Sequence, residues 1–314
     1  MADLYLVTGG AGFIGSNITQ TLVERGAQVR VVDNFSTGKR HNLASLLASI
    51  DLLEGDLADL DVARRAVEGV TYVIHQAAIP SVPRSIADPI GNNRAGVEAS
   101  LNLLVAAREA GVKRLVYASS SSAYGEAANG AKREDMPVHP LSPYGVAKLA
   151  GEHYCLSFHT VYGFETVALR YFNVFGPRQD PTSEYAAVIP RFITALLEGR
   201  PPTIYGDGEQ TRDFTYVGNI VEANLAALTA PGVAGQAFNI AMGRAVSLNE
   251  LVHTLRGLIG AENIQPEYVD PRPGDIRHSL ADVAKASQMM GFTPQVSFEA
   301  GLQKTIDWFA RQRE

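Results

Sequence analysis

The sequence predicts an α/β protein with a doubly wound parallel sheet, followed by a smaller α/β domain. Three observations predict this fold. Short continuous apolar runs alternate with amphipathic helical stretches in the first half, a glycine-rich turn joins the first run to the first helix, and Pro and Gly become frequent after Tyr171. Continuous apolar strands separated by helices are typical of a parallel sheet covered on both faces.

Each strand of the predicted sheet is a short apolar run, and each crossover is an amphipathic helix. In chain order, we expect strands within 4–7, 28–32, 52–53, 72–74 and 114–117, and helices at 14–25, 63–68 and 97–110. A longer helix at 143–162 leads into a strand at 166–170.

The second domain is predicted from shorter and less regular elements. We expect a strand at 212–216 and another at 237–240 that returns to the first domain. The first domain is predicted to cover 1–170 with returning segments at about 213–245, and the second mainly 171–314. No long linker separates them, so we expect tight packing with a cleft between.

Composition bounds the class of protein. Of 314 residues, 46% are hydrophobic and 19% charged, which is enough for a core and excludes wholesale disorder. The net charge of −6 provides no overall field for nucleic acid or an anionic membrane. The single cysteine, Cys155, excludes an intramolecular disulfide and a cysteine zinc site, and no metal site is expected. Without a secretory signal or an apolar run of about 18 residues, we expect a cytoplasmic protein.

A glycine-rich turn follows the first strand and opens the first helix. Gly9, Gly12 and Gly15 form G-x-x-G-x-x-G, a variant of the dinucleotide fingerprint. Glycine permits a tight turn and lets backbone N–H groups approach a pyrophosphate at the helix N-terminus. A turn without a ligand is the alternative, but the strand–turn–helix context favours a dinucleotide site.

The end of the second strand indicates which dinucleotide is bound. Asp33 lies there, and its carboxylate can accept hydrogen bonds from the adenosine ribose and would repel a 2′-phosphate. The sequence therefore favours NAD over NADP. Lys39 and Arg40 lie nearby and weigh against this preference.

A tyrosine and a lysine are spaced to share one helix face. Tyr144 and Lys148 lie at i and i+4, so the phenol and the ammonium can point into one site. An unperturbed phenol has a pKa of about 10. The lysine and a positive nicotinamide ring would both favour the phenolate, which makes Tyr144 a candidate general base. The serine run 119–122 is predicted just after the fifth strand, where α/β sheets place ligands.

Seven motifs together resemble one family. They are TGGAGFIG at 8–15, EGDL at 54–57, HQAA at 75–78, YGVAK at 144–148, RYFNVFGPRQDP at 170–181, RDFTYV at 212–217 and PRPGDIRHS at 271–279. The chain resembles the extended short-chain dehydrogenases/reductases, and within them the UDP-sugar 4-epimerases related to UDP-glucose and UDP-N-acetylglucosamine 4-epimerases. The resemblance implies a Rossmann domain with bound NAD and a UDP-sugar-binding domain.

The resemblance also implies a mechanism. Ser120 holds the sugar O4, Tyr144 takes its proton, and Lys148 hydrogen-bonds the nicotinamide ribose. A transient 4-keto sugar turns over and is reduced on its other face, which inverts C4. Related dehydratases and decarboxylases carry acidic residues where this chain has Ser121 and Ser122, so simple epimerisation is favoured.

The motifs and the resemblance together predict the binding residues. Cofactor contacts are expected for Gly9, Gly12, Phe13, Ile14, Gly15, Asp33, Asn34, Ser36, Asp56, Leu57, Gln76, Ala77, Ala78, Asn93, Tyr144, Lys148 and Tyr171. Substrate contacts are expected for Ser120, Ser121, Ser122, Tyr144, Asn173, Ala187, Val188, Tyr205, Gly206, Arg212, Arg272 and Ser279. The two arginines would clamp the diphosphate.

The sequence predicts the identity of the substrate's sugar less specifically than it predicts the UDP part. We expect UDP-glucose and UDP-galactose, and the small Ser279 leaves room for the N-acetyl group of UDP-GlcNAc and UDP-GalNAc. Two alternatives stay open: a UDP-glucuronate 4-epimerase, and a non-catalytic NAD-binding sensor, although such sensors usually lose the tyrosine or the lysine. The resemblance also implies a homodimer formed by the helices at 96–110 and 143–162.

Three further side chains have mainly structural interpretations. His75 is expected to pack or to touch the cofactor rather than act as a base, and Cys155 to be a small buried hydrophobe. For Tyr124, packing and lining the substrate pocket are about equally supported.

Overall fold

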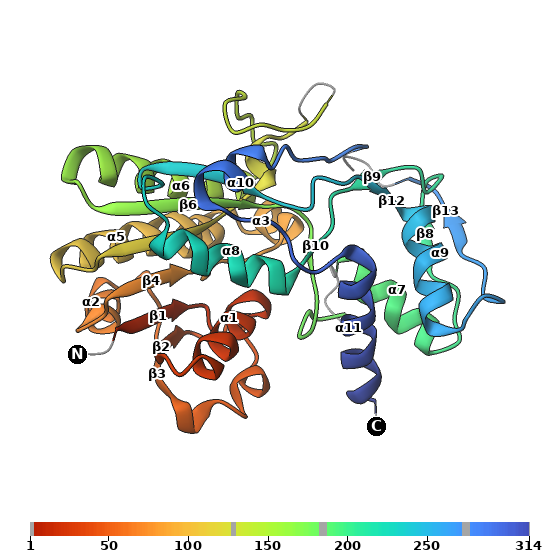
Figure 1. Ribbon diagram of the computed structural model, residues 1–314, viewed down its shortest axis with the longest axis horizontal. Coiled ribbons are helices and arrows are strands. Elements are labelled where there is room, and N and C mark those ends of the chain that lie inside the picture. The colour runs from red at the N-terminus through yellow and green to blue at the C-terminus, as the bar shows by residue number, and fades with distance from the viewer. Residues whose placement is uncertain (1–2, 127–129, 182–186, 272–276, 314) are drawn as a thin grey trace.

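A parallel sheet of seven strands forms the core of the larger part of the molecule, on the left in Figure 1. The computed structural model describes residues 3–126, 130–181, 187–271 and 277–313. The strands are β1 (Leu4–Thr8), β2 (Gln28–Asp33), β3 (Ile50–Glu54), β4 (Tyr72–His75), β5 (Arg114–Ser120), β6 (Glu165–Tyr171) and β11 (Gln236–Ile240). Their order is β11-β6-β5-β4-β1-β2-β3, so the chain reverses direction of winding between β1 and β4. Ligands of such sheets bind at the carboxyl ends of the strands near this point.

Helices cover both faces of this sheet, as predicted. One face packs against α1 (Phe13–Glu24), α8 (Val217–Thr229) and α10 (Ala284–Met290). The other packs against α2 (Leu60–Val67), α5 (Ala99–Glu109) and α6 (Pro143–Tyr162). The doubly wound α/β fold is therefore confirmed.

The strands after Tyr171 are short, as predicted, but the helices there are not, since those at Leu248–Ile259 and Phe298–Arg311 have 12 and 14 residues. The remaining helices are α3 (Val82–Ala87), α4 (Pro89–Asn93), α7 (Val188–Leu197), α9 (Leu248–Ile259) and α11 (Phe298–Arg311), with short turns η1 (Arg40–Leu43), η2 (Leu47–Ser49), η3 (Arg94–Glu98) and η4 (Ser121–Ala123). Paired two- or three-residue strands are β7 (Val174–Phe175) with β10 (Thr215–Tyr216), β9 (Thr211–Arg212) with β12 (Val246–Ser247), and β8 (Thr203–Tyr205) with β13 (Glu267–Val269).

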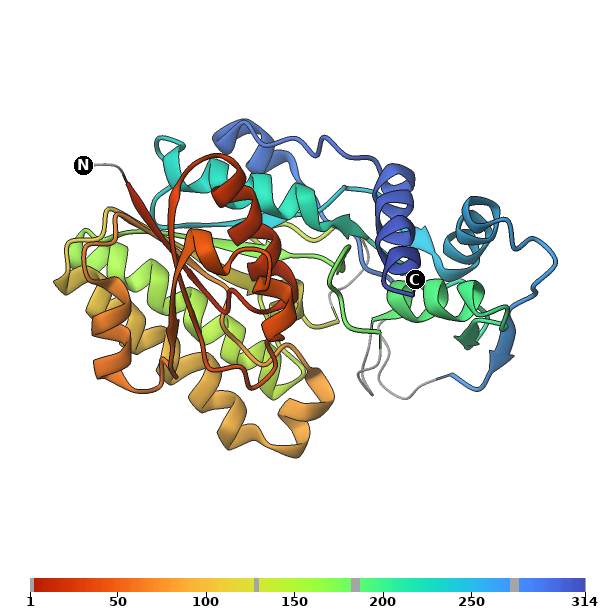
Figure 2. The ribbon, with the colours of Figure 1, turned by 90° about the horizontal axis from the view of Figure 1, so that it is seen from below.

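A second apolar core lies to one side of the sheet, among α7, α9 and α11 (Figures 1 and 2). Phe192, Leu251 and Phe298 are among its buried residues. The division at residue 170 stays a proposal. Besides β11, helix α10 also returns to the central sheet, so segments beyond 213–245 contribute to the first unit.

Helix α6, which carries Tyr144 and Lys148, has well-defined ends. The Ser142 hydroxyl accepts the Gly145 N–H at 3.1 Å, Pro143 occupies the first turn, and Gly163 ends the helix with a φ of 69°. An N-cap serine, an early proline and a left-handed glycine are the preferred residues at these positions. The helix therefore presents Tyr144 and Lys148 on one face.

Three expected elements differ from the structure. The strand at 212–216 is split into β9 and β10, because the buried Asp213 carboxylate turns inward and accepts the N–H groups of Met242, Gly243 and Ala281. The serine run does not follow β5 as a whole, since Ser119 and Ser120 end the strand. The helix at 97–110 begins in a π-helical turn, η3. Within the described ranges, no helix has the length and apolarity to span a bilayer.

Candidate active site

The predicted catalytic side chains meet where β5 ends against the first turns of α6. Ser120 is the last residue of β5 and is buried, and its Oγ accepts the Ser122 N–H at 3.1 Å. The Ser120 hydroxyl also hydrogen-bonds the Tyr144 phenol. Lys148 lies one turn further along α6, buried, with Nζ donating to the Ala118 carbonyl at 2.7 Å. The fold thus brings the three residues into one cluster.

Burial controls the electrostatics of this cluster. It raises the pKa of Tyr144, and the hydrogen bond with Ser120 opposes the rise. Burial lowers the pKa of Lys148 to about 8. Desolvation of the phenol is the largest influence of the protein on the Tyr144 pKa, and the expected combined effect of Lys148 and a bound nicotinamide ring stays a prediction.

His75 has a structural role beside the cluster. It hydrogen-bonds Thr8 Oγ1 at 2.6 Å and Ser100 Oγ at 2.9 Å, and it is buried. Burial, reinforced by the charge of Lys148, lowers the pKa of His75 to about 3. Cys155 is likewise buried, which raises the pKa of its thiol, so both residues have the inert roles predicted for them.

A buried ion pair between Glu152 and Arg170, which was not predicted from the sequence, contacts the residue next to Ser120. Glu152 accepts Arg170 Nη2 at 2.6 Å and Ser119 Oγ at 2.6 Å, and both charged side chains are buried. Arg170 Nη1 also donates to the Tyr124 hydroxyl at 2.7 Å, and that hydroxyl donates to Asn239 at 2.7 Å. Tyr124 is therefore a packing residue. The sequence did contain a signal for the role of Glu152, because it lies one turn beyond Lys148 on the same face of α6.

The glycine turn has the shape that a dinucleotide needs. Gly9 has a φ of 64°, and a Cβ there would lie 2.8 Å from the Ala77 backbone. A Cβ at Gly15 would lie 2.2 Å from the Gly9 carbonyl oxygen. Helix α1 follows Gly12 without a side-chain cap, which leaves its first-turn N–H groups for a phosphate. These residues fit a bound dinucleotide pyrophosphate.

Asp33 is held at the carboxyl end of β2, beside the glycine turn. Its Oδ2 accepts the Ala11 N–H at 2.9 Å and its Oδ1 the Phe35 N–H at 2.8 Å. Burial raises the pKa of Asp33, and these two bonds oppose the rise. The two cations that weighed against NAD are engaged elsewhere: Lys39 pairs with Asp180 at 3.5 Å and Arg40 with Glu54 at 2.7 Å.

Other predicted cofactor residues occupy the neighbouring strand ends. Asn34 Nδ2 donates to Asp56 Oδ2 at 3.3 Å. Gln76 Nε2 donates to the Tyr171 hydroxyl at 3.0 Å, and Asn224, which was not predicted, donates to the same hydroxyl at 2.8 Å. Leu57 is buried, whereas Phe13, Ile14, Ala77 and Ala78 are half-buried and Ser36 and Asn93 are exposed. The structure gives the positions of these residues, and their contacts with the cofactor stay a prediction.

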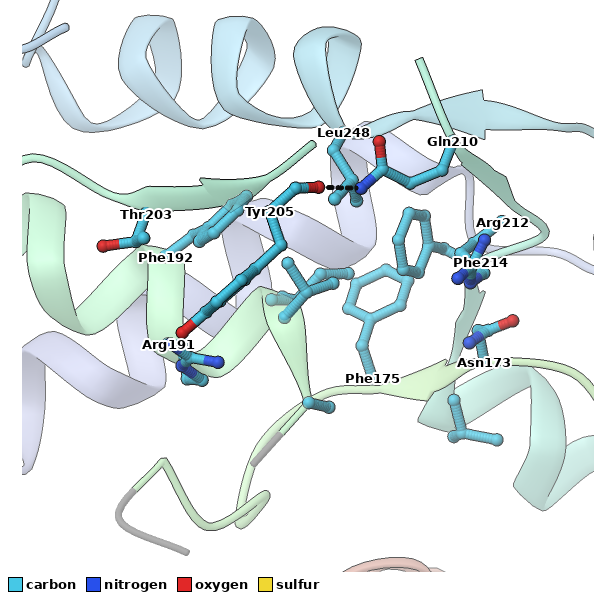
Figure 3. Close-up of a pocket in the computed structure, with 14 residues that line it drawn as sticks. Asn173, Phe175, Arg191, Phe192, Thr203, Tyr205, Gln210, Arg212, Phe214 and Leu248 are labelled. Carbon is cyan, nitrogen blue, oxygen red and sulfur yellow. Dashed lines mark hydrogen bonds between the residues drawn. The ribbon is translucent and has the colours of Figure 1, made fainter. Parts of the chain in front are cut away.

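A cavity of about 230 Å³ lies between β7, β8, β9 and α7 (Figure 3). Five predicted substrate residues line it: Asn173, Ala187, Val188, Tyr205 and Arg212. The other lining residues were not predicted, and they are Val174, Phe175, Ile189, Arg191, Phe192, Thr203, Gln210, Phe214 and Leu248. Val174, Phe175 and Phe214 lie inside motifs that carry the family resemblance, so their positions in the sequence could have indicated this role.

Some predicted substrate residues do not line this cavity. Gly206 follows Tyr205, with its N–H bonded to the Val269 carbonyl at 2.8 Å. Ser279 is buried, and its N–H donates to the Thr211 carbonyl at 3.1 Å, next to Arg212. Arg272 lies outside the described residues. Across those described, no set of three or more His, Cys, Asp or Glu side chains could hold a metal ion.

Comparison with known proteins identifies the family. The family model described as the NAD dependent epimerase/dehydratase family matches residues 5–241. The chain belongs to this family. UDP-glucose 4-epimerase of Mycolicibacterium smegmatis, one of the epimerase/dehydratase relatives, is 39% identical over 313 residues, which cover 98% of this chain and 99% of that protein.

Solved structures of the epimerase/dehydratase family have the same fold. The UDP-N-acetylglucosamine 4-epimerase from Methanobrevibacter ruminantium M1, in complex with UDP-N-acetylmuramic acid, is 41% identical, with a TM-score of 0.93 and 99% of each chain covered. The UDP-glucose 4-epimerase of Thermus thermophilus, in complex with NAD, is 38% identical, with a TM-score of 0.87, covering 98% of this chain and 99% of that one. NAD, the cofactor predicted from the sequence, is thus confirmed as the cofactor of the family to which this chain belongs.

Proposed function

We propose that the protein is a UDP-sugar 4-epimerase, an isomerase that inverts C4 through a 4-keto sugar. The observation that carries the proposal is the cluster at the end of β5 of the buried Ser120 and Lys148 with the half-buried Tyr144. The family includes both epimerases and dehydratases. Ser121 and Ser122 supply no acidic group for the elimination of water, which favours epimerisation.

Each residue of the cluster has a distinct role. Tyr144 takes the proton from the sugar O4 and later returns it, while Ser120 holds that oxygen within reach. NAD, when bound, would supply the hydride chemistry at C4 that the inversion requires. Lys148 holds the nicotinamide ribose, and its positive charge favours the phenolate form of Tyr144.

The nucleotide part of the substrate would occupy the cavity that Asn173 and Arg212 line. Arg212 offers a planar guanidinium suited to two phosphate oxygens, and Asn173 lies next to it in Figure 3. Tyr205 and Val188 line the part of the cavity that would receive the uracil. We propose UDP-glucose and UDP-galactose as substrates, and UDP-GlcNAc and UDP-GalNAc as a second pair, because Ser279 is small.

A panel of UDP-sugars tests this function. The purified protein should convert UDP-glucose and UDP-galactose into each other, with released NAD identified by mass spectrometry. Turnover of UDP-glucuronate in place of these sugars would favour the uronic acid alternative. Absence of all 4-epimerase activity with NAD bound would favour the sensor interpretation and overturn the proposal.

Replacing Arg212 by alanine should weaken nucleotide binding. A hydrogen bond to a charged group contributes about 1.5–3 kcal/mol, so we expect the Kd for UDP to rise about 10-fold to 150-fold. Arg212→Lys should recover only part of the loss, since lysine cannot bind two oxygens in one plane. Calorimetric titration with UDP measures both variants. Unchanged UDP affinity in Arg212→Ala would contradict the assigned role.

We also propose a homodimer through α6. Val146, Tyr154 and Val161 are exposed apolar side chains that lie on one side of this helix. Such an apolar face is typical of a contact between subunits. Val161→Asp should convert a dimer into a monomer in light-scattering measurements, whereas a wild-type protein that is already monomeric would rule the dimer out.

A further inference from the structure

The segment 173–178, which runs from the wall of the substrate cavity toward α1, has an unusual backbone. Only three non-glycine residues in the described ranges have a positive φ, and two of them, Asn173 at 20° and Arg178 at 70°, lie in this segment. Non-glycine residues adopt such angles only where the surrounding structure imposes them, and they cluster at functional sites. The contacts of Arg178 show what imposes the angle here.

Arg178 is bound to the helix that follows the glycine turn. Its Nη1 donates to the Ser16 carbonyl at 3.0 Å, and its Nη2 donates to the Gln20 side chain. Asn17 Nδ2 adds a donation to the Pro177 carbonyl at 3.1 Å. All three partners lie in the first two turns of α1. The segment is therefore tied to the helix whose N-terminus faces the predicted pyrophosphate site.

The other end of the segment forms a wall of the substrate cavity. Asn173 and Phe175 line the cavity, and the Asn173 carbonyl accepts the Thr215 N–H at 3.1 Å. Between the two ends, Gly176 packs closely against Val217, since a Cβ at Gly176 would lie 2.4 Å from Val217 Cγ1. A short and tightly held stretch of backbone therefore connects the cavity wall to α1.

Polar contacts, rather than apolar packing, hold Arg178 in place. A second cavity, of about 280 Å³, lies beside it and is lined by Asn17, Gln20, Glu24 and Trp308, among others. With a shorter side chain at position 178, water would therefore fill the space that the arginine leaves, and no void would form in an apolar core. Variants at this position are expected to fold.

We propose that Arg178 is a positioning residue that couples the cofactor-binding helix to the substrate cavity. Through it, occupancy of the NAD site would fix the position of Asn173, so that NAD and a nucleotide in the cavity strengthen each other's binding. This inference rests on the proposed function, because it takes the ligand of the cavity to be a UDP-sugar. Such coupling is reciprocal, since each ligand must change the affinity for the other by the same factor.

The test measures this coupling with UDP, which binds without reacting. The Kd for NAD is determined by equilibrium dialysis of the full chain, with and without saturating UDP. In the wild type, UDP should lower the Kd for NAD at least about fivefold, and in Arg178→Gln less than about twofold. The matched control is Arg25→Gln, an arginine at the end of the same helix that pairs with Glu222, and its coupling should equal that of the wild type.

The outcomes separate this inference from the proposed function. Failure of UDP to bind the wild type overturns both. Binding of UDP with equal coupling in the wild type and Arg178→Gln overturns the role of Arg178 alone, as does an equal loss of coupling in Arg25→Gln. Should Arg178→Gln not fold, Asn17→Ala removes the Pro177 contact and tests the same connection, and unchanged coupling in that variant overturns the proposal.

Discussion

Tyr144→Phe is expected to lower the turnover of UDP-galactose by about 10²-fold to 10⁴-fold. This is the range that a positioned general base contributes, and phenylalanine cannot take the proton from O4. The ring of phenylalanine fills the same space, so NAD should remain bound. Turnover is measured under saturating substrate, and the NAD content is measured after the protein is denatured.

A second tyrosine on the same helix provides the control for this experiment. Tyr162 is exposed at the end of α6 and packs against Phe158 with ring centroids 5.0 Å apart. Tyr162→Phe should keep wild-type turnover. Activity of Tyr144→Phe close to that of the wild type would refute the assignment of the base.

Glu152→Gln is expected to reduce the free energy of unfolding by about 3–5 kcal/mol. Removing one partner of a buried ion pair leaves the other charge uncompensated, and Arg170 is buried away from the water that could stabilise it. Glutamine has almost the same size, so the loss reports on charge and hydrogen bonding. Urea unfolding measures the change.

The control pair is Arg114 with Glu165, in which the carboxylate is half exposed and the distance is 2.7 Å. Glu165→Gln should cost at most about 1 kcal/mol, as is usual for pairs in contact with water. An equally small loss in Glu152→Gln would show that the buried pair does not stabilise the fold. Because Glu152 also holds Ser119, the residue before Ser120, the variant should lower turnover as well.

The serine run shows how a local pattern can mislead. All four serines were expected to follow the fifth strand, yet Ser119 and Ser120 belong to β5 and are buried. Pairing with β6 over the whole of β5 extends the strand beyond its apolar residues. Ser119 can be buried there because Glu152 accepts its hydroxyl.

Local sequence patterns were sufficient to predict the alternation of strands and helices up to residue 170, the glycine turn and the Tyr144–Lys148 spacing. Apolar periodicity, glycines at a turn and side chains one helical turn apart are all encoded within a few neighbouring residues. For the same reason the family resemblance could be carried by short motifs.

The packing of the whole chain was needed to establish which distant residues meet and how burial changes their chemistry. Arg170 and Glu152 pair across two elements, and Arg178 reaches Ser16 over 162 positions of sequence. The pKa of Tyr144 is raised rather than lowered by the protein groups, because desolvation depends on everything packed around the phenol. Such long-range contacts and burial depend on the tertiary structure, and no local pattern encodes them.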